Sequence, residues 1–360
     1  MIIPVYTCKK LLLAGVLSLI IIQGYAADRY AVRTGNWNNT STWSATSGGG
    51  SGASVPVAGD NVYLESGHTV TVTANAACSN LTFRSVGAAS VLRVNGSVTL
   101  TISGNLTLEK PANADFSCTV EGSGTIICAN LYAGSTASSP TGNNTTRTHT
   151  FNSSIADLTI TGDLSINSYF SSNNRRRNGT FNLLSGALSV SGSIRTSNQN
   201  ASNISTFTMT VGDQSGSLLL SGSNPFVLSG TGTNTISLNG TSALVNYSGT
   251  GAQPILSATY TNLTLSGSNT KSFPSDVTIN GTLSVEGTAT TAGNVPGYGP
   301  LSAIRYKGSS AQSTGIEFPS TFSGSGGIII DNTAGVSISA SKTIETNLIL
   351  TSGLFSVGSN

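Results

Sequence analysis

The best candidates for acid–base chemistry in this chain are two aspartates, Asp157 and Asp163. Each precedes a similar apolar-polar-apolar triplet, 158–160 and 164–166, so a turn between the triplets could bring the two carboxylates together. Paired carboxylates flank the scissile bond in glycosidases. The competing interpretation is that both are corner residues whose short side chains hydrogen-bond their own backbone. The sequence favours the corner role, and we predict no catalytic residue.

No pattern in the chain suits a metal site. The two histidines, His68 and His149, lie in unrelated phrases, the acidic residues are scattered singly, and no Cys-x-x-Cys pair occurs. Zinc sites need clustered Cys and His ligands, and solenoid calcium sites need a Gly/Asp-rich repeat. We therefore predict no metal, no cofactor and no catalytic role for either histidine.

Three cysteines lie beyond the first 26 residues. Cys118 and Cys128 flank what reads as an out-and-back pair of strands, so they are candidates for a disulfide in an oxidising compartment. The alternative is that both, together with Cys78, are small hydrophobic residues of the core.

A cluster of three arginines, Arg175, Arg176 and Arg177, is the strongest candidate for binding an anionic polysaccharide. Adjacent guanidinium groups can hold sulfate or carboxylate groups through paired hydrogen bonds. Asparagine and glycine flank the cluster, which predicts a solvated loop, and a loop without a ligand is the simpler interpretation.

Both tryptophans of the chain, Trp37 and Trp43, lie in one segment near the start. Aromatic faces pack against the apolar faces of sugar rings, so this pair is a candidate carbohydrate platform. The other interpretation is structural. The segment 27–60 would cover the first strands of a repeat array, whose ends expose unpaired backbone and apolar side chains.

The first 26 residues have the features of an export signal. Lys9 and Lys10 supply positive charge, 11–22 is apolar, and 24–26 offers small residues for cleavage after Ala26. The apolar run is shorter than the roughly 20 residues that span a bilayer, so we predict cleavage and no transmembrane segment. We expect an extracellular or cell-surface protein.

Charge excludes several classes of partner. Only 8% of residues are charged, and the formal net charge is +2, an excess that Lys9 and Lys10 supply. The chain from residue 27 onward is therefore neutral, and it has no long-range field to attract nucleic acid or anionic lipid.

A short sequence motif, about the length of one strand, recurs along the chain and predicts its fold. Each copy alternates apolar and small polar residues between Gly, Ser or Asn turns, which is typical of a strand with one buried face. The five clearest copies are 105–108 (NLTL), 163–166 (DLSI), 262–265 (NLTL), 282–285 (TLSV) and 347–350 (NLIL).

Recurrence of this kind favours stacked windings over a single core. We predict an all-β chain: a signal peptide at 1–26, an N-terminal cap at 27–60, and a right-handed parallel β-helix at 61–360 that continues beyond the last residue. Equivalent strands would pair at about 4.8 Å. Tandem β-sandwich domains are the alternative, since short strands with frequent turns also suit them.

Several segments resemble those of large exported β-strand-repeat surface proteins of the Bacteroidota type. The opening segment is also distantly similar to the start of a G8 domain. The segments that carry the resemblance are 35–44 (GNWNNTSTWS), 55–62 (VPVAGDNV), 66–72 (SGHTVTV), 331–336 (DNTAGV) and 348–354 (LILTSGL). The resemblance implies a secreted or surface protein, often exported by a type IX route and often adhesive.

These observations favour a non-enzymatic structural or adhesive segment, a monomeric rod whose partner is a surface polysaccharide or another cell-surface molecule. Two other functions stay open. One is a β-helical polysaccharide lyase or hydrolase, acting in a groove along one face. The other is a carbohydrate-binding module that uses Trp37 and Trp43.

Overall fold

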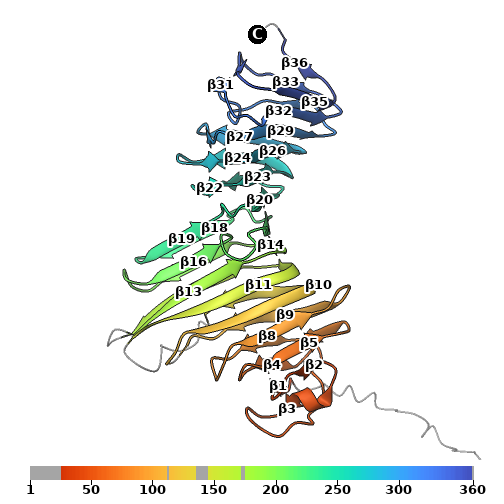
Figure 1. Cartoon of the computed structure of the whole chain (residues 1–360), viewed down its shortest axis with the longest axis vertical. Coiled ribbons are helices and arrows are strands. Elements are labelled where there is room, and N and C mark those ends of the chain that lie inside the picture. Colours follow the sequence, from red (N-terminus) through yellow and green to blue (C-terminus); the bar gives the residue numbers. More distant parts are fainter. Residues whose placement is uncertain (1–25, 112, 135–144, 172–174, 359–360) are drawn as a thin grey trace, which may run out of the picture.

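The computed structural model describes residues 26–111, 113–134, 145–171 and 175–358, and these residues form an all-β fold (Figure 1). The predicted all-β class is confirmed. Within the described residues, the strands follow one another along a single long axis, from β1 near one end to β36 at the other (Figure 1).

One parallel ladder runs through most of the chain. Its twelve strands pair with one another in the order in which they occur in the sequence. From β11 onward, every third strand of the chain belongs to this ladder. The members are β6 (Ala76–Cys78), β9 (Thr99–Leu108), β10 (Phe116–Ala133), β11 (Thr146–Ile160), β14 (Ala187–Val190), β17 (Ser217–Leu220), β20 (Leu244–Tyr247), β23 (Asn262–Leu265), β26 (Thr282–Glu286), β29 (Ala303–Gly308), β32 (Gly327–Asn332) and β35 (Leu348–Ser352).

Two further parallel ladders share the first half of the chain with it. The long strands β9, β10 and β11 bend and contribute a different part to each ladder they join. The second ladder adds β1 (Asp28–Ala31), β4 (Asn61–Leu64), β7 (Asn80–Phe83), β12 (Leu164–Ser171), β15 (Ile194–Asn198) and β18 (Phe226–Gly230). The third adds β2 (Gly35–Asn36), β5 (Thr69–Val72), β8 (Ser90–Val94), β13 (Arg175–Leu183), β16 (Ile204–Thr208) and β19 (Thr233–Ser237).

Shorter strands replace these two ladders in the second half. They form three three-stranded sheets and one two-stranded sheet, all of them parallel. These are β21 (Gln253–Pro254), β24 (Ser268–Phe273) and β27 (Thr288–Gly293); β22 (Thr259–Tyr260), β25 (Thr278–Ile279) and β28 (Gly297–Tyr298); β30 (Gln312–Ser313), β33 (Val336–Ser337) and β36 (Phe355–Ser356); and β31 (Thr321–Phe322) with β34 (Thr343–Ile344).

Antiparallel pairing, the rule in β-sandwiches, is rare in the described residues. It joins β1 to β3 (Trp43–Ser44) and β12 to β13. A short 3-10 helix, η1 (Thr40–Thr42), precedes β3, and the side chain of Asn39 caps it by accepting a hydrogen bond from the Ser41 N–H.

Inward side chains stack in columns because each strand sits in register on the next. The twelve-strand ladder carries one such column, which is apolar at every position. Its members are Cys78, Ile102, Cys128, Ile160, Val190, Leu220, Tyr247, Leu265, Val285, Tyr306, Ile330 and Leu350. All but the last are buried, so alternation along each strand becomes a continuous core along the axis.

Asparagine side chains join paired strands of the second ladder. Asn61 donates to Asp28, Asn80 donates to Asn61, and Asn130 donates to Asn105, at 3.0 to 3.2 Å. The Asn80 carbonyl oxygen accepts the backbone N–H of Asn105. Neighbours in this asparagine ladder are between 19 and 33 residues apart in sequence, so the chain between paired strands varies in length while the side chains stay in register.

Three stacked phenylalanines provide a direct test of the packing. Phe181 lies between Phe151 and Phe207 with ring centroids 5.3 and 5.6 Å apart and rings nearly parallel, and all three are fully buried. Phe181→Ala should lower the free energy of unfolding by about 3 to 5 kcal/mol, because it leaves a cavity in the stack. Guanidinium denaturation followed by circular dichroism measures this.

The matched control is Thr180→Ala, which changes the outward neighbour on the same strand and should cost less than about 1 kcal/mol. Equal losses for the two variants would mean that the phenylalanine stack contributes nothing specific.

Candidate functional site

The tryptophan pair is not a sugar platform. Trp37 is 3% exposed and Trp43 is fully buried. Their rings meet edge to face at 5.2 Å, and Trp43 Nε1 donates to the Trp37 carbonyl oxygen at 2.7 Å. No ring face is left for a ligand, so the prediction that Trp37 and Trp43 bind carbohydrate is wrong.

The arginine cluster does not form a solvated loop. Residues 175–177 are the first residues of β13, which pairs with β12 on one side and β11 on the other. Arg177 is fully buried, and its guanidinium donates to the carbonyl oxygens of Pro111 and Thr145 at 2.5 and 2.9 Å. Because Arg177 is buried, it and its half-buried neighbours Arg175 and Arg176 do not present three adjacent cations to a polysaccharide.

The two aspartates bind different partners. Asp163 accepts the backbone N–H of Ser193 at 2.8 Å and pairs with Arg195 at 2.6 Å, while Asp157 accepts from the Thr159 hydroxyl at 3.3 Å. Asp163 therefore acts as a corner residue, although it bonds the next winding rather than its own backbone.

The cysteines are free thiols in the core. Cys118 and Cys128 lie on the single strand β10, so the candidate disulfide between them is wrong and the alternative, three core cysteines, is confirmed. The Gly/Ser segment between them, which reads as a reversal, is instead a corner where the register shifts after Gly122. Gly122 has φ +111°, and a Cβ there would lie 2.2 Å from the Val94 carbonyl oxygen. Burial raises the pKa of Cys128 to about 12, so this thiol is unreactive.

A buried polar cluster surrounds His149, which the sequence left without a role. His149 is fully buried, and Nε2 lies 3.2 Å from the Ala133 carbonyl oxygen and 2.9 Å from that of Asn167. Carbonyl oxygens only accept, so Nε2 carries a proton. Burial lowers the pKa of His149 to about 4, so the ring is neutral at pH 7. A Cβ at Gly179 would lie 2.9 Å from Nε2, so the glycine makes room for this ring.

Two further ionisable groups are buried in the second half of the chain without an ion pair among the described residues. Lys271 donates to the Gly249 carbonyl oxygen at 2.6 Å and to the Gln253 side chain at 2.7 Å, and burial lowers its pKa. Glu317 accepts from the Tyr306 hydroxyl at 2.6 Å. Neither group reaches solvent, so both serve the packing.

The described surface is hollowed beside the asparagine ladder. This hollow, the tyrosine groove, has a volume of about 380 Å³ and is lined by Asn61, Tyr63, Asn80, Thr82, Asn105, Thr107 and Glu109. One outward column of the second ladder contains, in order, Tyr63, Thr82, Thr107 and Tyr132. Tyr63 stacks on Tyr30, with ring centroids 4.7 Å apart and planes 13° apart.

A charged trio adjoins the tyrosine groove, and one of its members, Glu109, lines it. Arg84 lies between two glutamates, with Nη1 3.1 Å from Glu65 and Nε 3.6 Å from Glu109. Its guanidinium carbon is 5.9 Å from the Tyr63 ring centroid. Sequence reasoning missed this site because Tyr63 and Tyr132 lie far apart in the sequence and belong to no common motif. Only the register of the strands brings them into one column.

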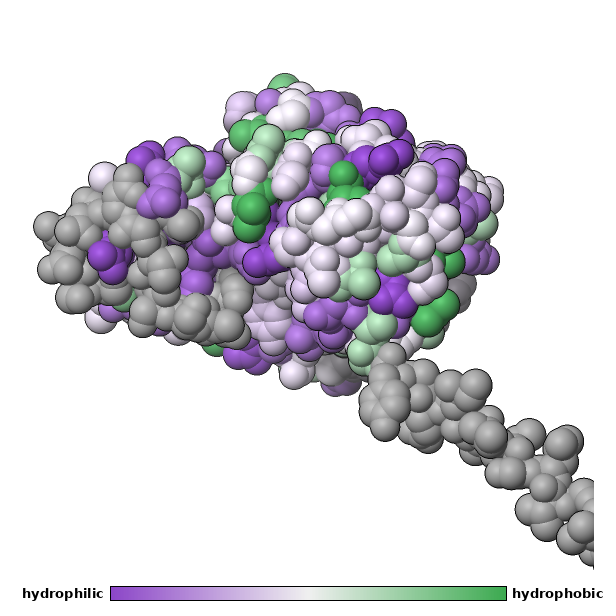
Figure 2. Space-filling view, turned by 90° about the horizontal axis from the view of Figure 1, so that it is seen from below, coloured by the Kyte–Doolittle hydropathy of each residue, from purple (hydrophilic) through white to green (hydrophobic). Residues whose placement is uncertain are grey.

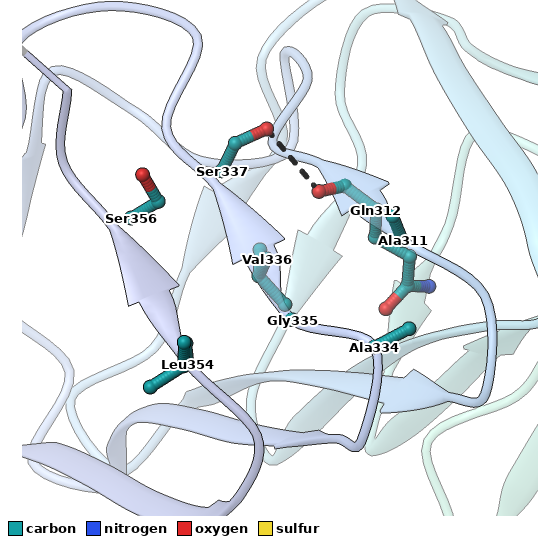
Figure 3. A pocket seen from close by; sticks show the side chains of 8 residues that line it. All are labelled: Ala311, Gln312, Ala334, Gly335, Val336, Ser337, Leu354 and Ser356. Atoms are coloured by element: carbon teal, nitrogen blue, oxygen red, sulfur yellow. Dashed lines mark hydrogen bonds between the residues drawn. The ribbon is translucent and has the colours of Figure 1, made fainter.

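A second hollow lies near the other end of the molecule. It has a volume of about 210 Å³ and is lined by Ala311, Gln312, Ala334, Gly335, Val336, Ser337, Leu354 and Ser356, on or next to three parallel short strands (Figure 3). Its lining holds no titratable side chain, so it offers no acid–base chemistry.

Among the residues that the structure describes, no large apolar face is visible at the end of the molecule nearest residue 26. Figure 2 shows hydrophilic and weakly hydrophobic residues mixed there, with hydrophobic ones in small groups. In the described ranges, no three His, Cys, Asp or Glu side chains gather as possible metal ligands. Nor does this part of the chain contain a helix long and apolar enough to cross a bilayer.

A comparison of the chain with protein-family models, with the curated proteins and with the solved structures finds no match.

Burial of His149 predicts a specific loss of stability in acid. Burial, helped by nearby Lys110 and Arg177, lowers its pKa from 6.5 to about 4, against the opposing effect of the hydrogen bonds to Ala133 and Asn167. The unfolded chain then takes up a proton below about pH 6.5 and the folded chain only below about pH 4, so stability falls as the pH drops through this window. The loss should be about 3 kcal/mol.

Denaturant unfolding at several pH values tests this, with His149→Gln compared with the parent. The variant should lose that part of the pH dependence, whereas His68→Gln, at a half-buried histidine, should keep it. Parallel curves for the parent and His149→Gln would contradict the assignment.

Proposed function

We propose that the chain is a β-solenoid rod, a right-handed parallel β-helix in which three strands make one winding. The observation that carries the proposal is the twelve-strand ladder, with its unbroken inward column from Cys78 to Leu350. The asparagine ladder supports it, because side chains up to 33 residues apart bond as neighbours. Eleven steps of about 4.8 Å make that ladder alone roughly 50 Å long.

The proposed role is a non-enzymatic structural and adhesive segment of an exported surface protein. The signal-like start, the neutral composition and the resemblance to exported repeat proteins support this assignment. A rod stabilised by contacts between neighbouring windings suits a spacer that carries a binding surface away from a cell. Within it, 27–60 serves as the cap and 61–360 as the repeats.

The alternative functions have less support. A polysaccharide lyase or hydrolase would need carboxylates and cations at one cleft, but Asp157 and Asp163 bind different partners and Arg177 is buried. A carbohydrate-binding module based on Trp37 and Trp43 would need exposed rings, and both are buried.

Removal of one whole winding tests the solenoid. Deletion of 263–282 joins Asn262 to Leu283, and Leu283 is the register partner of Leu263. Val245 would then contact Leu283 in place of Leu263, so the core column closes again and the protein should fold. Small-angle X-ray scattering should show a particle shorter by about 4.8 Å with an unchanged cross-section.

The matched control is deletion of 263–272, half as long, which interrupts a winding and should prevent folding. If the whole-winding deletion unfolds as completely as the half-winding one, the solenoid proposal fails.

Export has its own test, because it depends on the first 26 residues. Expressed in a Gram-negative host, the chain should reach the cell envelope with a mature terminus at Ala27. Ala26→Leu should block cleavage, since signal peptidase requires a small residue there, while Gln23→Leu should be cleaved normally. Intact-mass measurement distinguishes these outcomes, and an uncleaved cytoplasmic parent would contradict export.

A further inference from the structure

The tyrosine groove combines an aromatic face, free hydroxyl groups and a carboxylate. We propose that it binds a neutral oligosaccharide of two or so hexose units, lying against Tyr63 and Tyr132. The evidence for this site is the geometry of the second ladder, and it is independent of the proposed structural function.

The first argument is the orientation of Tyr63. Its ring is nearly parallel to that of Tyr30, which belongs to the preceding winding, so the ring plane lies across the column. Tyr30 covers one face of Tyr63. The next winding holds Thr82, the register partner of Tyr63, and Arg84, whose guanidinium carbon lies 5.9 Å from the Tyr63 ring centroid. The C–H face of a pyranose ring packs on an aromatic face of this kind, and would continue the stack that Tyr30 begins.

The second argument is the spacing along the column. Two threonines, Thr82 and Thr107, separate Tyr63 from Tyr132, which is half-buried. Tyr63 and these two small side chains line the hollow, and Tyr132 is the next residue of the column, one step beyond the lining. Three steps of about 4.8 Å place the tyrosines about 14 Å apart along the axis. This spacing and the volume of about 380 Å³ suit a short saccharide.

Hydrogen-bonding capacity is the third argument. A sugar hydroxyl both donates and accepts, and the hydroxyl groups of Thr82 and Thr107, which do the same, have no hydrogen-bond partner among the described residues. Glu109 is about one-third exposed at the edge of the groove and adds acceptor oxygens, although one of them already accepts the Ser85 N–H. The groove can therefore pair with several sugar hydroxyls at once.

Charge selects a neutral ligand over an anionic one. Glu109 is the one charged residue among those that line the groove, and its partner Arg84 is shared with the buried Glu65 outside the lining. A sulfated or uronic-acid chain would meet like charge here, whereas neutral hydroxyl groups can donate to the carboxylate.

Calorimetric titration of the whole chain with cellotetraose, mannotetraose and chitotetraose tests the proposal, with tetragalacturonate as the anionic probe. At least one neutral tetrasaccharide should bind with a Kd at or below about 1 mM, and tetragalacturonate should bind more weakly. Tyr63→Ala and Tyr132→Ala should each weaken binding about tenfold, because each removes a stacking surface. Tyr132→Phe should keep most of the affinity.

Controls separate loss of the site from loss of the fold. Thr180→Ala and Thr206→Ala change outward threonines of the third ladder, remote from the groove in register, and should leave affinity unchanged. Circular dichroism should show the parent spectrum for every variant, and amide signals of 80–84 and 105–109 should shift when the saccharide is added. Absence of binding by all neutral probes, stronger binding of the anionic probe, or unchanged affinity in both tyrosine-to-alanine variants would overturn the proposal.

Discussion

Registered stacking of equivalent side chains is the constraint on which the rest of this molecule depends. Each parallel pair places a residue directly over its partner about 4.8 Å away, so an apolar position in one winding requires an apolar position in the next. The column from Cys78 to Leu350 meets this requirement at twelve successive strands. The same constraint acts on polar residues: the asparagine ladder satisfies its amide groups between windings, and the buried His149 is held by carbonyl oxygens of neighbouring strands.

Alternation of apolar and polar residues was enough to predict strands and their buried positions, but it could not say which ladder a strand joins. The recurring phrase illustrates this: 105–108 lies in the second ladder next to β10, whereas 262–265 and 282–285 lie in the first. Alternation fixes only which side of a strand faces inward, and that information is the same on every face of a winding. The unequal spacing along the asparagine ladder also makes the repeat period hard to find in the sequence. Extra residues between paired strands lengthen the chain without changing the register.

Candidate site residues were predicted less well, for a related reason. Tryptophan and arginine side chains bind ligands when they are exposed. The local sequence gives no indication that Trp37, Trp43 and Arg177 are buried. The segment between Cys118 and Cys128 has the composition of a reversal, yet it turns a corner and the strand continues in the same direction of winding. Conversely, Tyr63 and Tyr132 look unrelated in sequence, and only the register puts them in one outward column beside the tyrosine groove. Ligand sites on stacked folds are built across windings, so they have no contiguous motif.

Distances between spin labels placed along one outward column test the stacking most directly. Thr101, Leu219 and Ile329 occupy the same outward column of the twelve-strand ladder, with Leu219 four steps from Thr101 and Ile329 five steps farther on. Cysteine labels at these positions suit the protein, since the buried native thiols are unreactive. Pulsed electron paramagnetic resonance should give about 19 Å for the first interval, about 24 Å for the second, and a total close to their sum of about 43 Å. A total distance well short of that sum, as separate domains folded back on one another would give, would contradict registered stacking along one axis.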